Sequence, residues 1–239
     1  MLPWITADEP LPPASSALAE QDGFEGLVCA GLDLTTERLI EAYSNGIFPW
    51  FSEGQPVLWW SPNPRMVLKL ENFRLHRSLE KVMRRQLGDS HDGNGWQIRV
   101  NTSFEQVMRA CAEPRNGQNG TWITEDIIQA YGGLHAMRKA HSIEVWRAEQ
   151  LIGGLYGVCL GKMFYGESMF AREADSSKTA LTWLVKFLLP RGVPMIDCQQ
   201  NTKHLSFMGA EEISRSEFLS TVSQLIKQDS IVFPIGIQA

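Results

Sequence analysis

The stretch SIEVWRAEQLIGGLYGVCLGKMFYGESM, residues 142–169, decides the fold. Apolar and polar residues alternate over 142–147, and a second apolar strand is predicted at 151–160, after a short turn. Gly161 and Lys162 predict a tight turn into a third strand at 163–169. A helix over 176–189, a buried strand at 195–198 and a helix from 214 to about 228 follow. Antiparallel strands, a crossing helix, one more strand and a helix predict an α+β fold with a mixed sheet.

The residues before this stretch predict a smaller N-terminal domain. Residues 1–26 are rich in Pro, Ala and Ser and predict a loosely docked arm. Helices are expected near 36–45, capped by Thr35 or Thr36, near 76–87, and from a Thr102-x-x-Glu105 capping box to about 111. The polar, glycine-bearing loop 89–95 is the best candidate for a boundary, which gives domains of residues 1–92 and 93–239.

Composition is that of an ordinary globular protein. Of the 239 residues, 44% are hydrophobic and 21% charged, which argues against disorder. No stretch is apolar for the roughly 20 residues that a membrane span needs, and the N-terminus lacks a secretory leader. We therefore expect a cytoplasmic protein. The four cysteines lie far apart and predict free thiols rather than a metal site.

Charge is distributed unevenly around a net value of −5. Residues 1–64 hold nine acidic side chains and one basic one, whereas residues 65–85 hold seven basic and two acidic ones. A local basic segment can bind a polyanion even when the whole protein is acidic. An ordinary solvated helix face is an equally good interpretation of the charges alone.

Aromatic residues gather in segments expected to be turns. Trp122 stands just before a predicted helix, and five more precede the basic segment: Phe48, Trp50, Phe51, Trp59 and Trp60. Aromatic side chains on turns suit base stacking, worth about 1–3 kcal/mol per base. Core packing is the alternative interpretation, and the sequence leaves both open.

Two carboxylates are predicted at neighbouring strand ends. Glu167 lies near the end of the third strand and Asp197 near the end of the strand at 195–198. A carboxylate that faces a cleft can orient a cationic substrate or take a proton. The alternative is that the two acids form ion pairs with Arg172 or Lys178.

Seven motifs in order carry a family resemblance. They are GIFPWFS at 46–52, WWSPNPR at 59–65, GTWIT at 120–124, HSIEVW at 141–146, GGLYG at 153–157, GESMF at 166–170 and IDCQ at 196–199. Together they resemble the leucyl/phenylalanyl-tRNA–protein transferases. The resemblance implies a small N-terminal domain followed by an N-acetyltransferase-like (GNAT-like) domain. It also implies transfer of Leu or Phe, and Met more weakly, from aminoacyl-tRNA to proteins that begin with Arg or Lys, which marks them for N-degron proteolysis.

The resemblance also assigns residues. It implies stacking of the tRNA 3′-terminal adenosine on Trp50 and Trp122, acceptor-peptide binding by Glu167, and catalysis by Asp197 and Gln199. The implied pocket for the aminoacyl side chain is Leu155, Met169, Leu181, Leu184 and Ile196. The implied tRNA-backbone contacts are Arg74, Arg77, Lys81, Arg84 and Arg85. No cofactor, metal, DNA or membrane partner is expected.

Two departures from the family pattern and three rival functions accompany this interpretation. Loop 89–95 looks long, and Leu205-Ser-Phe-Met-Gly-Ala replaces Leu-x-Ser-Leu-Gly-Ala. The main rival is an acetyl-CoA-dependent N-acetyltransferase, but residues 172–177 lack the glycines of its pyrophosphate loop. The other two are a non-catalytic RNA-binding protein and an enzyme that uses Cys198 with His204.

Overall fold

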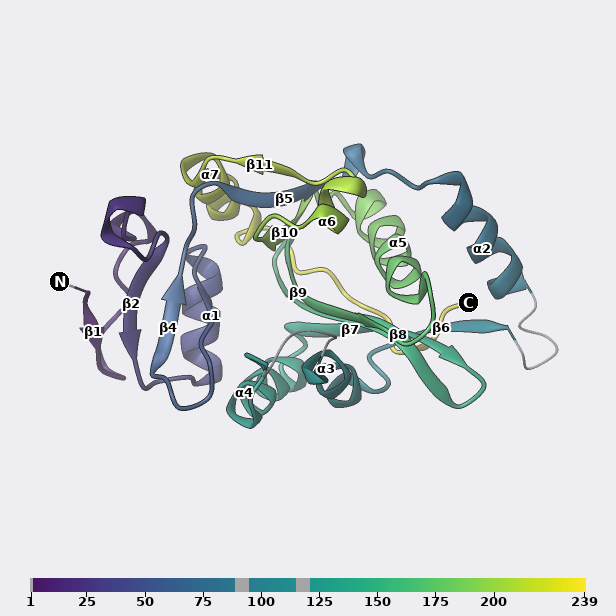
Figure 1. Cartoon of the computed structure of the whole chain (residues 1–239), viewed down its shortest axis with the longest axis horizontal. Helices are drawn as coiled ribbons and strands as arrows, with labels where there is room; N and C mark the ends of the chain where they lie inside the picture. The colour runs from purple at the N-terminus through teal and green to yellow at the C-terminus, as the bar shows by residue number, and fades with distance from the viewer. Residues whose placement is uncertain (1, 89–94, 115–120) are drawn as a thin grey trace.

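The fold is built on two sheets, one small and one large (Figure 1). The structure, a computed structural model, describes residues 2–88, 95–114 and 121–239. The small sheet has the order β1-β2-β4-β3 and the large one the order β11-β5-β10-β9-β8-β7-β6-β12. This mixed α/β architecture with a small N-terminal sheet confirms the coarse fold prediction.

The large sheet contains the strands that the sequence predicts most clearly. Its antiparallel centre is β7, β8 and β9, and β9 pairs with β10 in parallel. The bounds are β5 (Arg65–Lys69), β6 (Trp96–Val100), β7 (Ala140–Arg147), β8 (Gln150–Leu160), β9 (Met163–Ala171), β10 (Met195–Gln199), β11 (Glu211–Ile213) and β12 (Gly236–Ile237).

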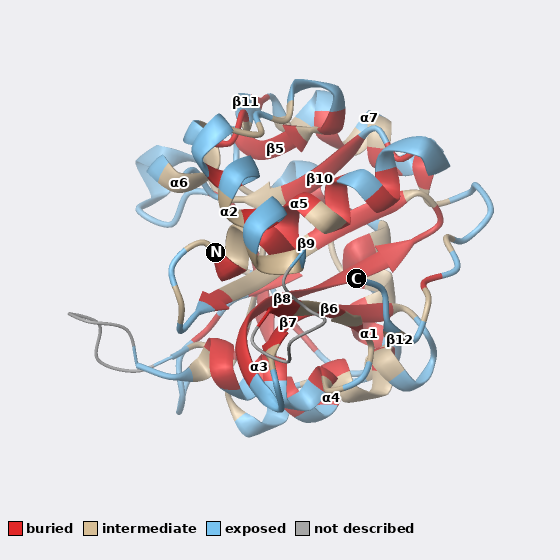
Figure 2. Ribbon diagram, turned by 90° about the vertical axis from the view of Figure 1, so that its right-hand side faces the viewer, coloured by how far each residue is buried: buried red, intermediate tan, exposed pale blue. Residues whose placement is uncertain are grey.

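Helices cover both faces of this sheet. Helices α3 and α4 pack on one face and α5 on the other, and the buried strands lie between them (red in Figure 2). The bounds are α1 (Thr36–Ser44), α2 (Arg77–Gly88), α3 (Phe104–Ala112), α4 (Glu125–Ala136), α5 (Ser176–Leu188), α6 (Lys203–Phe207) and α7 (Arg215–Leu225). Within the described ranges, no helix combines the length and hydrophobicity that crossing a bilayer requires.

The small sheet corrects the prediction that its aromatic segments are turns. Its strands are β1 (Trp4–Ile5), β2 (Leu27–Gly31), β3 (Phe48–Pro49) and β4 (Val57–Trp60). The two-residue β3 shows no alternation, and Trp59 and Trp60 next to Pro62 resemble a turn sequence. Pairing with β2 and β3 nevertheless gives β4 an extended conformation with Val57 and Trp59 buried.

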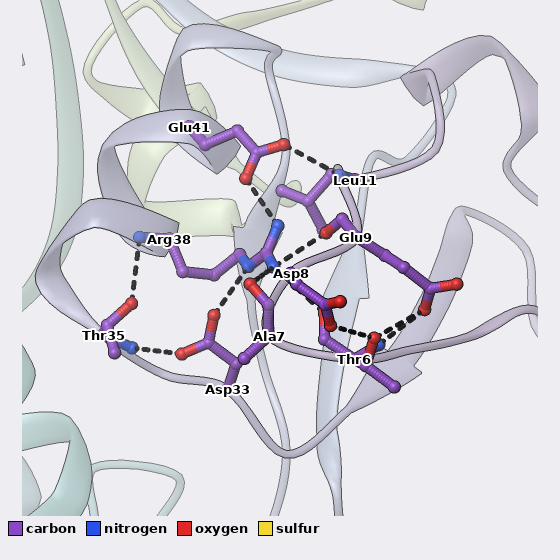
Figure 3. Close-up of polar contacts among 9 residues, drawn as sticks. All are labelled: Thr6, Ala7, Asp8, Glu9, Leu11, Asp33, Thr35, Arg38 and Glu41. Atoms are coloured by element: carbon purple, nitrogen blue, oxygen red, sulfur yellow. Dashed lines mark hydrogen bonds and ion pairs between the residues drawn. The ribbon is translucent and has the colours of Figure 1, made fainter.

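The N-terminal arm is firmly held, so the prediction of loose docking was wrong. Strand β1 pairs with β2 in parallel, and Arg38 of α1 lies buried beneath the segment that follows (Figure 3). Its guanidinium donates to Asp33 at 2.9 Å and to Glu41 at 2.5 Å. It also donates to the backbone carbonyls of Thr6, Ala7 and Glu9. Backbone contacts of this kind leave no hydrophobic pattern, so the sequence does not reveal them.

The boundary predicted within loop 89–95 falls on residues 89–94, which lie outside the described residues. The chain passes from the small sheet to the large one earlier, between Trp60 and Arg65. Strand β5 already belongs to the large sheet, and α2 packs against α5 and β6.

Helix α3 begins differently from the predicted capping box. Ser103 is its N-cap and makes no side-chain cap. The buried carboxylate of Glu144 instead accepts the backbone N–H groups of Thr102 and Ser103, at 2.9 and 2.8 Å. A carboxylate from β7 therefore satisfies the helix N-terminus, a long-range contact that local sequence cannot show.

A buried ion pair joins the two parts of the fold. Arg65 of β5 donates from Nε and Nη2 to the two oxygens of Asp197 on β10, at 2.8 and 2.6 Å, and both side chains are fully buried. The guanidinium also donates to the Gly46 carbonyl at 3.3 Å and lies over the Phe48 and Phe218 rings. One cation thus contacts the small sheet, the large sheet and α7.

Replacing Arg65 by Met should therefore destabilise the protein strongly. The change leaves Asp197 as a buried carboxylate without its counter-ion, which costs about 3–5 kcal/mol. The measurement is the free energy of unfolding in urea. Removing both charges, with Arg65→Met and Asp197→Leu together, should recover most of the loss. A double variant no more stable than Arg65→Met would contradict this account of the pair.

Candidate active site

A groove of about 2470 Å³ runs between the small sheet, the α3–α4 side of the large sheet and the α5–α6 side. The ends of β9 and β10 contribute to its wall. Nearly all the residues that the family resemblance assigns to substrate and catalysis border this one space.

The predicted aminoacyl pocket is assembled. Its five residues come from β8, β9, α5 and β10, and all of them line the groove: Leu155, Met169, Leu181, Leu184 and Ile196. Four are buried, and Met169 is half-buried. They form an apolar patch that fits an uncharged side chain.

The aromatic residues divide into two groups. Trp50 and Trp122 line the groove, and Trp50 is 43% exposed. Trp60 holds Trp50 in position: the Trp60 indole N–H donates to the Trp50 carbonyl at 2.7 Å, and the two rings pack edge-on. Phe48, Phe51 and Trp59 are buried in the core. Core packing is therefore confirmed for these three residues, and base stacking on Trp50 and Trp122 stays a prediction.

Glu167 faces the groove from an irregular position in β9. Tyr156 pairs with Ser168 and Gly157 with Gly166, so Glu167 is an extra residue that bulges out of the ladder. Bulges re-aim side chains and recur next to active sites. The Tyr131 hydroxyl donates to one Glu167 oxygen at 3.1 Å, and the Gln199 side-chain amide donates to the other at 3.3 Å.

The Glu167 side chain is half-buried, and its carboxyl is hydrogen-bonded. Burial raises its pKa to about 8, more than the hydrogen bonds of the tyrosine hydroxyls lower it. Behind it, the hydroxyls of Tyr131 and Tyr43 are hydrogen-bonded to each other, and the Tyr165 hydroxyl donates to the Tyr43 carbonyl at 2.7 Å. The carboxyl thus ends a buried chain of tyrosines.

Asp197 lies beneath the groove and does not border it. Its Oδ1 accepts from Arg65 and from the Gln199 backbone N–H at 2.9 Å, and its Oδ2 accepts from Arg65. The ladder with β5 shifts between Asp197 and Gln199, and Gln199 has a φ of 55°. Asp197 therefore fixes a sharp turn that presents Gln199 to the groove.

The alternative ion pairs for these two acids are not formed. Arg172 pairs with Glu113, and Lys178 pairs with Asp175. Asp197 pairs with Arg65, which the sequence shows only as one of seven cations between 65 and 85. The tyrosines behind Glu167 were missed as well. The hydroxyl of Tyr131 leaves no sequence pattern.

The basic residues lie away from the groove. Arg74 precedes α2, and Arg77, Lys81, Arg84 and Arg85 lie on it. All five are exposed, and no ion pair joins any of them to another described residue. Helix α2 is at the opposite end of the molecule from the small sheet (Figure 1). The structure thus leaves the predicted tRNA-backbone surface separate from the groove.

The structure also describes the Leu205–Ala210 segment, which departs from the family pattern. Phe207 stacks on His76 at 3.9 Å and Met208 is fully buried, whereas Leu205 lines the groove. The departure thus leaves Gln199 and Glu167 in contact. Gly120 of the GTWIT motif and residues 89–94 of the long loop lie outside the described residues.

Solved structures give only weak likenesses. L-PGS from Bacillus licheniformis aligns with a TM-score of 0.37 and 11% identity, over 75% of this chain and 53% of that chain. A conserved protein of unknown function from Bacteroides thetaiotaomicron aligns with a TM-score of 0.37 and 7% identity, over 92% of this chain and 70% of that chain. TM-scores this low carry no argument for the fold.

Sequence comparisons are far stronger. A relative from Janthinobacterium sp. (strain Marseille), named leucyl/phenylalanyl-tRNA–protein transferase, is 55% identical over 97% of this chain and 95% of its own length. One of the same name from Paraburkholderia phymatum is 52% identical over 98% of this chain and 94% of its own. The family model described as leucyl/phenylalanyl-tRNA protein transferase matches residues 67–223, and the model of its N-terminal domain matches residues 32–63. The chain therefore belongs to the leucyl/phenylalanyl-tRNA–protein transferase family.

Proposed function

We propose that this protein transfers Leu or Phe, and Met less readily, from aminoacyl-tRNA to the N-terminal Arg or Lys of acceptor proteins. One observation carries the proposal: a single groove brings together an apolar pocket, two tryptophans and the hydrogen-bonded Glu167–Gln199 pair. These parts suit an aminoacyl side chain, an adenosine ring and a reacting amine. The product carries a new N-terminal residue that marks it for N-degron proteolysis in the cytoplasm.

Catalysis of this transfer depends mainly on holding the two substrates in position. The donor is an ester and the product an amide, so the transfer runs downhill. Holding amine and ester together in reacting geometry contributes several kcal/mol. Trp50 and Trp122 hold the adenosine, and the five apolar residues hold the side chain. Because one methylene in such a pocket is worth only about 1–3 kcal/mol, related side chains are accepted to graded extents.

Asp197 and Gln199 are proposed as a unit in catalysis. Asp197 has no oxygen directed to the groove, so its contribution runs through the turn that it fixes at Gln199. The Gln199 amide then contacts Glu167 and orients the acceptor amine beside it. In this arrangement Asp197 is a positioning residue, whereas Glu167 and Gln199 meet the acceptor peptide.

A GNAT-like arrangement of the large sheet is proposed on the pairing of β9 and β10. These parallel strands are joined by α5, and only Phe164 and Tyr165 of β9 pair with β10. After these pairs, the ladder between β8 and β9 bulges at Glu167, and the ladder between β10 and β5 shifts register between Asp197 and Gln199. Glu167 and Gln199 therefore lie where β9 and β10 separate. Strands that separate after a short parallel pairing fit an acyltransferase cleft.

The acetyl-CoA-dependent alternative fits poorly at the start of α5. A pyrophosphate needs free backbone N–H groups and positive charge at a helix N-terminus. Here Asp175 is the N-cap, Glu173 stands beside it, and the Ser176 backbone N–H donates to the Glu173 carbonyl at 3.2 Å. Two carboxylates and a backbone N–H that is already hydrogen-bonded disfavour the binding of a phosphate at this helix end.

A thiol nucleophile is disfavoured for a similar reason. Burial raises the pKa of the Cys198 thiol, and its Sγ–H faces the Ile196 carbonyl at 3.7 Å. A thiol that stays protonated is a poor nucleophile.

The direct test is transfer of labelled Leu from leucyl-tRNA to a model protein that begins with Arg. The same protein beginning with Ala is the matched control. We expect label on the first protein alone, with no effect of added acetyl-CoA. Tight tRNA binding without transfer would favour a non-catalytic RNA-binding protein.

The basic surface of α2 can be tested separately. Arg84→Ala with Arg85→Ala should raise the KM for aminoacyl-tRNA, because two phosphate contacts are lost. The slope of log affinity against log salt should become shallower by about 2.

Arg138→Asn with Lys227→Ala is the matched control, since both residues are exposed cations away from α2. Asn is chosen because Arg138 has a φ of 56°, which Asn tolerates. An equal change in slope for both double variants would contradict a role specific to α2.

A further inference from the structure

We propose that Glu167 is the catalytic base of the transfer, which removes the proton from the acceptor α-ammonium as the amine attacks the ester. The proposal rests on the proposed function and assigns the proton that the reaction must release. It gives Glu167 a chemical role beyond contact with the acceptor peptide.

The positions of the groove carboxylates single out Glu167. Within the described part of the chain, the other carboxylates that line the groove are exposed to solvent: Glu53, Glu113, Glu125 and Asp126. Glu113 and Glu125 are also paired with arginines. Glu167 alone among them is half-buried, and it stands beside Gln199 at the point where β9 and β10 separate.

Asp197 is poorly arranged for the same task. Its oxygens are engaged by Arg65 and the Gln199 backbone, and it is fully buried beneath the groove. A proton acceptor must come within hydrogen-bond reach of the proton that it takes. Glu167 meets this condition from the groove wall, and Asp197 does not.

The surroundings of Glu167 hold the carboxylate in place and leave it basic. Tyr131 and Gln199 donate to one oxygen each. Burial raises the pKa of Glu167 to about 8, and an α-ammonium has a reference pKa of about 7.7–8.0, so proton transfer between them is nearly balanced. The ionisable groups that face it are Tyr43 of α1, Arg65 of β5, Tyr131 of α4, Tyr156 of β8, Tyr165 of β9 and Asp197 of β10.

The step balances as follows. One proton passes from the α-ammonium to Glu167, and the neutral amine forms a bond to the ester carbonyl carbon. The bond from that carbon to the ribose oxygen breaks, and a second proton moves from nitrogen to the departing oxygen. The products are an amide and a ribose hydroxyl, and Glu167 then loses its proton to solvent.

The first test compares two acceptors on Glu167→Gln, which keeps the shape of the side chain. With an ordinary N-terminal Arg acceptor at pH 7, kcat should fall by about tenfold, because only about a tenth of an amine of pKa near 8 is neutral without a base. The fall in kcat should exceed any rise in KM that follows from the lost charge. An aminooxy analogue of the acceptor is already neutral at pH 7 and needs no base. Its kcat should therefore differ by less than about threefold between the variant and the parent protein.

The second test is the pH dependence of kcat. Activity should fall as the pH drops and Glu167 becomes protonated. Tyr131→Phe removes a hydrogen bond that favours the carboxylate, so this fall should move to higher pH. Tyr165→Phe is the matched control. It loses only a bond to the Tyr43 carbonyl and should lower stability without moving the pH profile.

Three outcomes would overturn the proposal. Equal losses with both acceptors would make Glu167 a binding group only, as would a rise in KM with kcat unchanged. The same acceptor-dependent loss in His204→Gln, and not in Glu167→Gln, would move the base to the half-buried His204 on the groove wall. If the parent protein fails to transfer Leu at all, the proposed function itself fails.

Discussion

The ion pair between Arg65 and Asp197 is the contact on which the rest of the structure depends. Burying two charges costs several kcal/mol per ion unless their hydrogen-bonding groups are satisfied. Here the guanidinium is bidentate to the carboxylate, its third nitrogen reaches the Gly46 carbonyl, and two phenyl rings cover its faces. Such a fork fits one geometry, so it fixes how β5 lies against β10 and where the small sheet meets the large one.

The same pair determines the position of Gln199. Asp197 Oδ1 accepts from Arg65 and from the Gln199 backbone at once, and the positive φ of Gln199 needs such an anchor. Through the Gln199 amide the constraint reaches Glu167 on the next strand. The bulges of β9 and β10 thus bring Glu167 and Gln199 into contact. The buried Arg65–Asp197 pair beneath them fixes the position of Gln199 at the groove wall.

Sequence patterns predicted the four central strands of the large sheet, β7, β8, β9 and β10, because these strands bury continuous apolar faces, whereas β5, β6, β11 and β12 were not predicted. The helix at 36–45 with its Thr35 cap and the helix at 176–189 were confirmed within a residue. What failed depends on contacts distant in sequence. The small sheet needs β4 to pair with β2 and β3, and the start of α3 needs Glu144, which comes 40 residues after Phe104.

The candidate site was predictable only in part for the same reason. The motifs that hold Trp50, Glu167 and Gln199 marked them, and the structure brings these residues to one groove. Arg65 and Tyr131, which position the carboxylates, gave no signal beyond charge and apolar periodicity. A residue that touches a substrate must be of a type that suits the chemistry, so a motif can mark it. A residue that positions another side chain is recognised only from its contact partner, which becomes visible in the folded structure.

The charge distribution makes chemical sense only in three dimensions. The strongly acidic residues 1–64 form the small sheet on one side of the groove, and the exposed cations of α2 lie at the other end of the molecule (Figure 1). A polyanion and a cationic N-terminus favour opposite fields. A surface with one negative and one positive end therefore suits the proposed transfer, in which tRNA and a basic N-terminus meet at the groove, and a net charge of −5 alone would not suggest this.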